Sequence, residues 1–576
     1  MAQRGLQTHP LVVRRLEVLR TRDVTRRMRR VTLTGPQLAT FDHPAGRQPA
    51  FTSPAFDDHV KIVFAEGDLD EALPVQLSHG IEWPASSSRV TRDYTPRRLE
   101  AETAELDLDF VLGHDGPASQ WAERVQPGAP LWIVGPKSST VLPDDLDWIW
   151  LLGDETALPA IARFLEERPT DVPARVVVTV ESPDARLPLA TRPGDTVTWI
   201  EAPAHDGTAL QAAVLDHTPP AGTGYVWAGA ESRALLPIRR HLARELGMPK
   251  SHLNLTGYWH HREDAAHEAR PEADAGPLRW LATRAALRLG VLDAVARGAR
   301  TEEIAERIGV RAARLAPLLA VLEVAGLVKA GGSGRWSLGE QGEALLGDEH
   351  AREEYDGFEA EMLLSLLSLD EALTADVPSW QAHYGRTLHE TALESPAHYE
   401  ELVDGAGSLA FVLDALAADP SWNEIDRAGL TGPGAGAVAT ALAAREVAAE
   451  LVVMEDRGPL AAVRDEAGDL PVLWHEGFVP CDTAVAALAL EHRTDAEAVR
   501  LLRDLGEVTS SVVLVESLRA DALGPREADR ALLRLAASGA APRDGDAVAR
   551  LAEEAGWSVD GGTVLGWGYE TITLRR

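Results

Sequence analysis

Two short strings in this chain, residues 92–97 and 114–122, contain side chains that could together bind a dinucleotide. The first reads Arg-Asp-Tyr-Thr-Pro-Arg and the second reads His-Asp-Gly-Pro-Ala-Ser-Gln-Trp-Ala. Arg92 could pair with a pyrophosphate, the ring of Tyr94 could face a flat heterocycle, and a turn of small residues lets backbone amides approach phosphate. Either string alone is typical of an ordinary surface strand or turn. Together, each part has a physical role if the ligand is a flavin dinucleotide.

The elements that must position these strings are expected to be antiparallel strands. The first 140 residues contain frequent Gly and Pro and short alternating runs, such as residues 31–33 and 60–64. Half-buried antiparallel strands show this alternation of apolar and polar residues. Residues 1–140 are therefore predicted to form an antiparallel β-barrel or sandwich.

After the barrel, the pattern changes to strands that alternate with helices. The apolar run 148–152 is followed by a helical segment. Further strand and helix patterns follow at residues 175–182, 196–202 and 225–247. Because this alternation is typical of a parallel sheet with crossover helices, residues 141–262 are predicted to form an α/β domain.

The second half of the chain is predicted to be a separate helical and α/β region. Residues 263–276 are charged and rich in Ala and Pro, which is typical of a linker. Capped and apolar helical patterns, then a short β wing, predict a winged helix at residues 277–347. A helical connector is expected at 348–420, and a Rossmann-like α/β domain at 421–576.

Five further strings accompany the two dinucleotide strings in the first half. They are Asp58-His59-Val60-Lys61, Val134-Gly135-Pro136-Lys137, Gly153-Asp154-Glu155-Thr156-Ala157-Leu158-Pro159-Ala160, Trp227-Ala228-Gly229-Ala230-Glu231 and Gly257-Tyr258-Trp259. With them, residues 11–262 resemble the siderophore-interacting protein family, flavoprotein ferric-siderophore reductases of the ferredoxin-reductase-like superfamily. The resemblance implies an FAD-binding barrel followed by a NAD(P)H-binding α/β domain.

The resemblance also implies roles for individual residues. The expected FAD contacts are Arg92, Tyr94, Thr95, His114, Ala118, Ser119 and Trp121. The expected contacts near the nicotinamide are Asp154, Glu155 and Thr156, which directly follow a predicted strand. The expected contacts to an anionic ferric siderophore are Lys61, Lys137, His260 and Arg262.

Two positions depart from the family pattern. Gly113-His114 stands where the family usually has His-Gly, and His260 stands where it commonly has Arg. Either a neighbour such as Arg262 takes the basic role, or binding depends on pH, because an unperturbed His titrates near about 6.5.

The implied reaction depends on cofactors more than on an acid or base. NAD(P)H would give a hydride to the flavin, which would pass single electrons to Fe(III) in an imported siderophore. Reduction loosens the iron because hard anionic oxygen ligands hold Fe(III) more tightly than Fe(II), and no protein metal ligand is needed. Two alternatives stay open: a generic NAD(P)H:flavin electron-transfer reductase, and an S-adenosylmethionine-dependent transferase whose first half only binds ligand.

Residues 277–576 resemble class I O-methyltransferases, in which a winged-helix dimerisation domain precedes an S-adenosylmethionine-binding domain. The matching glycine loop contains Gly432, Gly434 and Gly436, and Glu455 follows the next strand. Working enzymes of this class usually have an acidic residue two positions before the first glycine of the loop, and a histidine that acts as the base. Leu430 replaces the acid and His492 is displaced by one position, which argues against S-adenosylmethionine-dependent catalysis. We expect this half to form a homodimer or to shape the reductase, with residual methyl transfer as the alternative.

Composition limits the partners and the compartment. The 56 Lys and Arg against 89 Asp and Glu give a formal charge of −33, so the field of the whole molecule repels nucleic acid and anionic lipid. The single cysteine, Cys481, allows no internal disulfide, and metal ligands at regular spacing are absent from the sequence. Without a signal-like or membrane-spanning stretch in the sequence, the protein is expected in the cytoplasm.

Overall fold

The computed structural model describes residues 5–65, 72–84, 86, 88–113, 116–204, 206–259, 276–331, 334–347, 349–468, 470–519 and 527–576. The chain forms two compact units. Unit 1 comprises Met1–Asp23, Met28–Leu142 and Met362–Arg576, and unit 2 comprises Val24–Arg27 and Pro143–Glu361. Among the described residues, none of the helices is long and apolar enough to cross a membrane.

Unit 1 begins with a seven-stranded antiparallel sheet in the order β10-β11-β3-β2-β12-β6-β9. Its strands are β2 (Val13–Thr25), β3 (Met28–Thr34), β6 (Val60–Ala65), β9 (Arg89–Tyr94), β10 (Pro96–Glu100), β11 (Glu105–Val111) and β12 (Pro130–Val134). The edge strands β9 and β10 are joined through Thr95, so the sheet curls until its two edges meet. This arrangement confirms the predicted antiparallel barrel.

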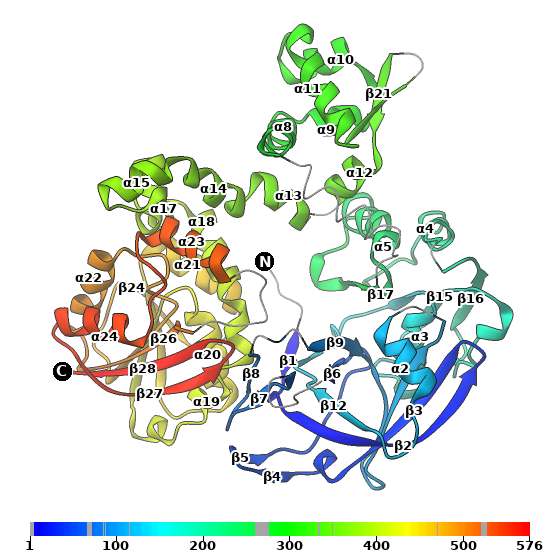
Figure 1. Ribbon diagram of the computed structural model, residues 1–576, viewed down its shortest axis with the longest axis horizontal. Coiled ribbons are helices and arrows are strands. Elements are labelled where there is room, and N and C mark those ends of the chain that lie inside the picture. Colours follow the sequence, from blue (N-terminus) through cyan, green and yellow to red (C-terminus); the bar gives the residue numbers. More distant parts are fainter. Residues whose placement is uncertain are drawn as a thin grey trace. The chain divides into compact units, whose positions relative to one another are not determined.

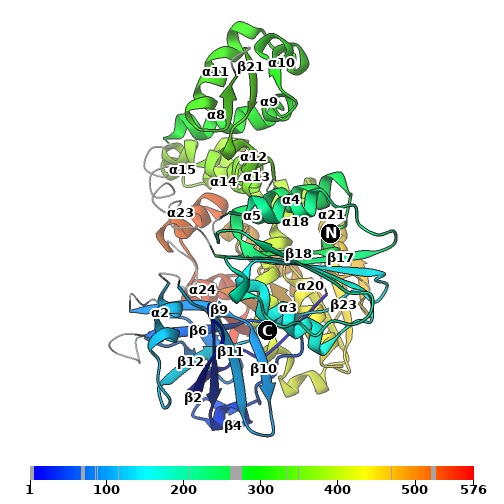
Figure 2. The same ribbon diagram turned by 90° about the vertical axis from the view of Figure 1, so that its right-hand side faces the viewer.

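The core of the curled sheet comes from the predicted alternation. Leu16 and Val18 of β2 and Val31 and Leu33 of β3 are buried together, each pair two residues apart on one face of its strand. Helix α2 (Pro117–Arg124) packs on β11 and β3 and lies beside the sheet in Figure 2. Short elements complete this part: β1 (Leu6–Thr8), η1 (Pro36–Leu38), β4 (Phe41–His43), β5 (Gly46–Gln48), β7 (Val75–Gln76), β8 (Ile81–Glu82) and β13 (Ser138–Thr140).

Unit 2 contains a five-stranded parallel sheet in the order β16-β15-β14-β17-β18. Its strands are β14 (Trp148–Gly153), β15 (Ala174–Val180), β16 (Thr196–Glu201), β17 (Gly224–Glu231) and β18 (Leu253–Trp259). Every residue of β14 and β17 is buried, as expected for central strands covered on both faces. The connecting elements are η2 (Glu155–Ala157), α3 (Leu158–Glu167), η3 (Pro183–Ala185), α4 (Thr208–Leu215), α5 (Ser232–Arg240), η4 (His241–Glu245) and η5 (Lys250–His252).

Unit 2 continues with a winged helix, whose elements gather as one group in Figure 1. It contains α8 (Pro277–Arg288), α9 (Val291–Val295), β19 (Ala299–Arg300), α10 (Thr301–Ile308), α11 (Ala312–Val324), β20 (Val328–Ala330), β21 (Arg335–Leu338), α12 (Glu340–Gly347) and α13 (Glu349–Asp356). The three strands pair in the order β19-β21-β20 and form the wing.

Helices then lead to the second α/β sheet. They are α14 (Phe358–Ser365), η6 (Leu366–Ser368), α15 (Leu369–Ala375), α16 (Ser379–Tyr384), α17 (Leu388–Glu394), α18 (Pro396–Gly405), η7 (Ala406–Phe411), α19 (Asp414–Ala417) and η8 (Pro420–Glu424). The predominance of helices in this connector agrees with the composition of the sequence.

The last sheet has seven strands in the order β24-β23-β22-β25-β26-β28-β27, of which the first five are parallel. They are β22 (Arg427–Thr431), β23 (Glu450–Glu455), β24 (Leu473–Glu476), β25 (Thr483–Ala487), β26 (Ser511–Ser517), β27 (Ser558–Gly566) and β28 (Tyr569–Arg575). The helices are α20 (Ala435–Ala444), α21 (Arg457–Ala467), α22 (Asp495–Leu505), α23 (Glu527–Ser538) and α24 (Gly545–Glu554). The predicted Rossmann-like arrangement is confirmed.

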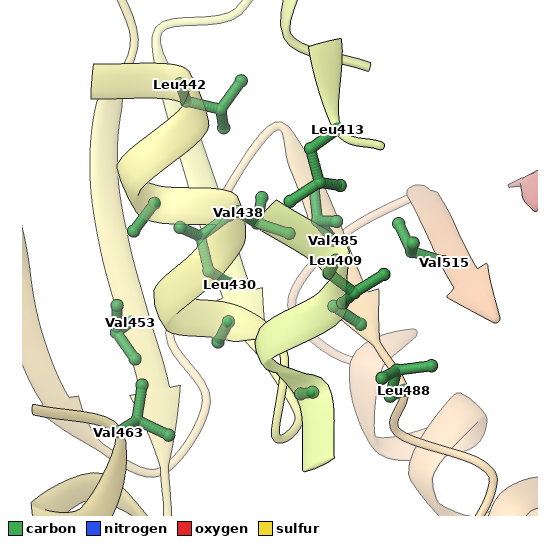
Figure 3. Packing of buried hydrophobic residues seen from close by; sticks show 14 of the residues in the cluster. Leu409, Leu413, Leu430, Val438, Leu442, Val453, Val463, Val485, Leu488 and Val515 are labelled. Atoms are coloured by element: carbon green, nitrogen blue, oxygen red, sulfur yellow. The ribbon is translucent and has the colours of Figure 1, made fainter. Parts of the chain in front are cut away.

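Separate apolar clusters bury residues from the two faces of this sheet. In one cluster, Leu430 and Val453 of the central strands pack with Val438 and Leu442 of α20 (Figure 3). Leu409 of η7 belongs to the same cluster and lies near Val485 in Figure 3. The helical connector therefore contributes directly to the core of the sheet that follows it.

Candidate functional site

The first candidate flavin string lies along β9 and its junction with β10. Arg92 is exposed, and its guanidinium donates to the carbonyl oxygen of Thr91 at 2.7 Å. The ring of Tyr94 lies 4.4 Å from that of Phe110, and burial raises the pKa of its hydroxyl. Thr95 is buried where the two edge strands meet. The string thus presents an exposed cation next to a packed aromatic ring.

The second string forms the start of α2. Pro117 is the first residue of the helix, and among the described residues no side chain caps the amides that follow it. A methyl group built on Gly116 would meet no atom of the described residues within 4 Å, so the turn is open toward that part of the chain. Within the described part of the chain, Ser119 Oγ is buried without a hydrogen-bond partner. Unsatisfied donors at a helix start suit a phosphate.

The two strings converge through their aromatic side chains. Phe110 lies 4.4 Å from Tyr94 and 5.5 Å from Trp121, and Trp121 lies 5.7 Å from Phe64. Trp121 is therefore part of the packing that fixes α2 on the sheet. The exposed arginine, the open turn and the unpaired hydroxyl fit FAD. His114 lies outside the described residues.

In unit 2, Asp154 joins the carboxyl ends of three strands. Its carboxylate accepts hydrogen bonds from Thr156 N at 2.8 Å, Glu231 N at 3.0 Å and Trp259 Nε1 at 2.8 Å, and from the Thr156 hydroxyl. Burial raises the pKa of Asp154, and these hydrogen bonds oppose that shift. Asp154 and Thr156 thus hold the β14 loop against β17 and β18.

Glu155 is also engaged within unit 2. Its Oε2 accepts from Arg27 Nε at 2.8 Å, and its Oε1 accepts from Glu181 N at 2.8 Å. Arg27 also pairs with the Glu181 carboxylate at 2.5 Å. The three predicted nicotinamide residues therefore lie together at the carboxyl end of β14, where open α/β sheets bind ligands.

Glu231, at the end of β17, offers an unused acceptor at this edge. Its Oε2 accepts from Ala234 N at 3.0 Å and caps α5. Its Oε1 is buried without a hydrogen-bond partner in the described part of the chain. A buried carboxylate oxygen without a donor is unfavourable and calls for an explanation. A ribose hydroxyl or the carboxamide group of a nicotinamide nucleotide would donate the missing hydrogen bond. The sheet edge therefore fits a nicotinamide nucleotide.

The predicted siderophore contacts Lys61 and Lys137 lie in unit 1. Lys61 faces Asp93 across the β6–β9 pair, with Nζ–Oδ distances of 2.9 and 3.1 Å. Crowding of Lys137 by protein atoms lowers its pKa, with Asp93 opposing and Lys61 adding to the shift. The two lysines and Asp93 therefore form one charged cluster. His260 and Arg262 lie outside the described residues.

The C-terminal glycine loop is closed by protein atoms. All residues from Thr431 to Gly436 are buried. A Cβ on Gly432 would lie 2.4 Å from the Ala487 carbonyl oxygen, and one on Gly434 would lie 2.5 Å from Leu409 Cδ1. Figure 3 shows Leu409 among the side chains that pack near the start of α20. The space above the loop is therefore filled by Leu409 and Ala487.

Glu455, the acid after the next strand, is turned into the core. Its Oε1 accepts from the Thr431 hydroxyl at 2.8 Å and from Gly432 N. Burial raises the pKa of Glu455, while the positive charge of Arg493 and these donors lower it. With its carboxylate used internally and the loop covered, the residues present do not fit S-adenosylmethionine.

His492, the displaced base, lies in the same core. Burial and the neighbouring Arg493 and His389 hold its pKa well below the ordinary value. Arg493 Nη1 lies 3.1 Å from His492 Nε2, and the His389 ring lies 5.4 Å away. Burial also lowers the pKa of His389 to about 3. These histidines are neutral packing residues at neutral pH.

Several relevant residues escaped the sequence reasoning. Arg97 and Asp109 are buried near one another in the curled sheet, with Nε–Oδ2 at 3.8 Å. Arg97 stands in the first string, so its position was a usable signal. Leu409, Phe411 and Trp567 gave no signal, because their importance comes from contacts with residues distant in the chain.

The curled sheet with its open phosphate turn and the parallel sheet with an unused acceptor define a two-domain flavoprotein oxidoreductase. The siderophore-interacting FAD-binding domain matches residues 17–140, and the siderophore-interacting protein domain matches residues 146–262. The chain belongs to the siderophore-interacting protein family.

Two curated relatives illustrate the match. The chain is 31% identical over 250 residues to an NADPH-dependent ferric-chelate reductase of Escherichia coli, covering 43% of this chain and 92% of that protein. It is 28% identical over 266 residues to the ferric vibriobactin reductase ViuB of Vibrio cholerae, covering 45% of this chain and 93% of that protein.

Two solved structures are each similar to part of this chain. A siderophore utilization protein from T. fusca is 35% identical, with a TM-score of 0.40. The match covers 45% of this chain and 96% of the T. fusca chain. The mitomycin 7-O-methyltransferase MmcR is 19% identical, with a TM-score of 0.39, and covers 55% of this chain and 99% of its own.

Proposed function

We propose that the protein is a ferric-siderophore reductase that uses NAD(P)H and FAD. The observation that carries this proposal is the Lys61 and Lys137 pair, set in a chain of formal charge −33 that belongs to a family with an FAD-binding domain. An acidic protein needs a local basic cluster to attract an anion. The name of the Escherichia coli relative supports NADPH as the electron donor and a ferric chelate as the acceptor.

In the proposed flavin site, Arg92 pairs with the pyrophosphate, while the amides of Ala118 and Ser119 and the Ser119 hydroxyl hold phosphate oxygens. Tyr94 and Thr95 border the flavin, and Trp121 fixes the helix that carries the turn. When bound, FAD supplies the redox chemistry: a hydride from NAD(P)H enters, and its electrons leave singly to a pair of ferric complexes.

In the proposed nicotinamide site, Asp154 is a positioning residue. Its hydrogen bonds to Thr156, Glu231 and Trp259 shape the edge of the parallel sheet. Glu231 Oε1 accepts a hydrogen bond from the nucleotide, since this oxygen has no hydrogen-bond partner in the described structure. Glu155 steadies the same loop through Arg27 and the amide of Glu181.

We further propose a homodimer formed through the winged helix, in a protein that acts on imported siderophores in the cytoplasm. Apolar side chains are exposed on two of its helices. They are Leu278, Leu281 and Leu289 on or directly after α8 and Val324 at the end of α11. A second copy would remove this surface from water. Light scattering of the full chain tests the dimer.

The reductase proposal is tested by anaerobic spectroscopy of the FAD-loaded full chain. We expect NADPH to bleach the flavin absorption and ferric ferrichrome to restore it, with ferrous iron captured by ferrozine. A generic flavin reductase would be reoxidised equally fast by ferric citrate and by ferrichrome. A chain that cannot be loaded with FAD would overturn the proposal.

A Lys61→Gln, Lys137→Gln double variant tests the basic cluster. Removing both charges should raise the KM for an anionic ferric siderophore by roughly tenfold or more, because each lost charge-assisted contact costs at least about 1.5 kcal/mol. A matched Lys250→Gln, Lys329→Gln double variant, which removes one lysine from η5 and one from β20 of unit 2, controls for net charge. Equal effects of the two variants would contradict a role for this cluster.

A further inference from the structure

The C-terminal half contacts the curled sheet beside Lys137, inside unit 1. Lys137 Nζ lies 4.8 Å from the centre of the Phe411 ring, a distance at which a cation is attracted to an aromatic face. The Phe411 ring lies 5.6 Å from that of Trp567. Two aromatic side chains from the methyltransferase-like half therefore border a lysine assigned to the siderophore site.

Trp567 is held in a strained turn between β27 and β28. Gly566, Trp567 and Gly568 all have positive φ, and Trp567 has φ 53°. This conformation is unfavourable for a bulky residue, so other contacts must compensate. Trp567 packs on a buried cluster of residues from the N-terminal part of unit 1. That cluster contains Leu11, Val63, Ile81, Trp83 and Val134.

Polar contacts fix the same arrangement. Glu82 accepts from Gly568 N at 3.0 Å and pairs with Arg519 at 3.2 Å. The backbones come close where β8 lies beside β27 (Figure 1), since a Cβ on Gly566 would lie 2.7 Å from the Ile81 carbonyl oxygen. The position of the aromatic pair therefore depends on several independent contacts.

The charge next to this aromatic pair is small. Asp93 lies within an ion-pair distance of Lys61, so one of the two positive charges is balanced. The Lys61, Lys137 and Asp93 cluster then has a formal charge of about +1, from the ordinary charges of these groups at neutral pH. Such a cluster suits a complex of low negative charge better than a highly charged tris-catecholate.

We propose that Phe411, supported by Trp567, is a specificity-determining residue of the ferric-siderophore site and selects ferric complexes of low charge that carry aryl groups. An aryl arm can pack against the Phe411 ring while the chelating oxygens face Lys137, since aromatic rings attract at centroid distances of roughly 4.5–7 Å. This inference rests on the proposed reductase function. It gives the C-terminal half a role in substrate choice that needs no methyl donor.

Two neutral ferric complexes with the same chelating group isolate the aryl contribution. Ferric tris(benzohydroxamate) has phenyl groups where ferric tris(acetohydroxamate) has methyl groups. Steady-state reduction by the FAD-loaded full chain with NADPH gives a KM for each. We expect the wild-type KM to be lower for the benzohydroxamate by roughly threefold to tenfold.

A Phe411→Leu variant removes the ring but keeps apolar bulk at the site. In this variant, we expect the KM values of the two complexes to differ only as far as their difference in hydrophobicity requires. The benzohydroxamate KM should rise, and it should change more than the acetohydroxamate KM. Trp567→Leu should shift the ratio in the same direction by less. Lys137→Gln should change both KM values by a similar factor, because the chelating group is shared.

Tyr384→Leu is the matched control. It removes an aromatic ring of the same half whose described ring neighbours, at 4.6 Å, are Trp380 and His383. We expect it to leave the KM ratio unchanged, and circular dichroism melting should show that all variants fold.

The outcomes separate the two proposals. An unchanged KM ratio in Phe411→Leu would overturn the specificity role. If both KM values also fell by the same factor, the ring would only shield Lys137. Failure of both complexes to reoxidise the reduced wild-type flavin would overturn the reductase function as well.

Discussion

The protein contains two α/β sheets whose five parallel strands follow the same order, but the polar groups at the carboxyl ends of these strands differ in whether they have partners. In the five-stranded sheet of unit 2, Glu231 keeps one buried carboxylate oxygen without a partner in the described structure. In the seven-stranded sheet of unit 1, Glu455 uses its carboxylate on Thr431 and Gly432. Leu409 fills the space above the glycine loop there. A ligand site in this fold depends on which polar groups are left unsatisfied, and the strand order alone does not create one.

The N-terminal and C-terminal halves also differ in the groups that they leave available to a ligand. The family match covers the part with open donors and acceptors, at residues 17–140 and 146–262. In the C-terminal half, Glu455 and the glycine loop are engaged in internal contacts, and Phe411 contributes an aromatic side chain beside Lys137. The comparison can be tested by disturbing each sheet separately.

Glu455→Ala should give the largest effect. It leaves the Thr431 hydroxyl and the Gly432 amide without an acceptor in the core, which should lower the free energy of unfolding of the C-terminal half by about 2–3 kcal/mol. Urea unfolding followed by circular dichroism measures the change. Glu450→Ala, at the exposed start of the same strand, should cost less than about 0.5 kcal/mol. Similar losses in both variants would contradict a structural role for Glu455.

Ligands should change the free energy of unfolding almost as much, and their effects should differ between the two α/β sheets. FAD at about 100 times its Kd should stabilise unit 1, and NADPH should stabilise unit 2, each by about 2.7 kcal/mol. S-adenosylmethionine at 1 mM, roughly the concentration that saturates micromolar sites, should leave the melting curve unchanged. A clear shift with S-adenosylmethionine would show that Leu409 moves aside and that the glycine loop still binds.

Ser119→Ala tests the open turn at α2. Removing a hydroxyl that has no hydrogen-bond partner among the described residues should not lower the stability of the apoprotein, yet it should weaken FAD binding by roughly fivefold to tenfold. Equilibrium dialysis or flavin fluorescence gives the Kd. Ser138→Ala, in β13 of the same unit, is the control. Loss of stability without loss of FAD affinity would assign Ser119 to packing alone.

The smallest effect concerns pH. Burial, with Arg493 and Arg500, lowers the pKa of His389 to about 3 in the folded protein, so between pH 6.5 and 3 the unfolded chain binds more protons. Stability from this group is complete above about pH 6.5 and falls on acidification, by less than about 1 kcal/mol between pH 7 and 6. His389→Asn should flatten the pH dependence of urea unfolding. Parallel curves for the variant and the wild type would contradict this origin.

The sequence predicted much of the fold because its signals are local. Alternation at residues 31–33 and 60–64 appears as β3 and β6, and the apolar run 148–152 appears as β14. The open turn before Ser119 could be expected from its Gly-Pro start. Strand β18, which ends in the Gly257-Tyr258-Trp259 string, was not expected as a strand, because its exposed end weakens the periodic pattern.

The sequence by itself determined the fold classes along the chain, the family of the first half and its FAD and NAD(P)H cofactors. These follow from backbone preferences, side-chain periodicity and residue types within short strings. Only the tertiary structure decided that Leu409 covers the glycine loop, that Glu455 turns inward and that Phe411 meets Lys137. Those outcomes depend on packing between side chains far apart in the chain, and such packing leaves no local pattern.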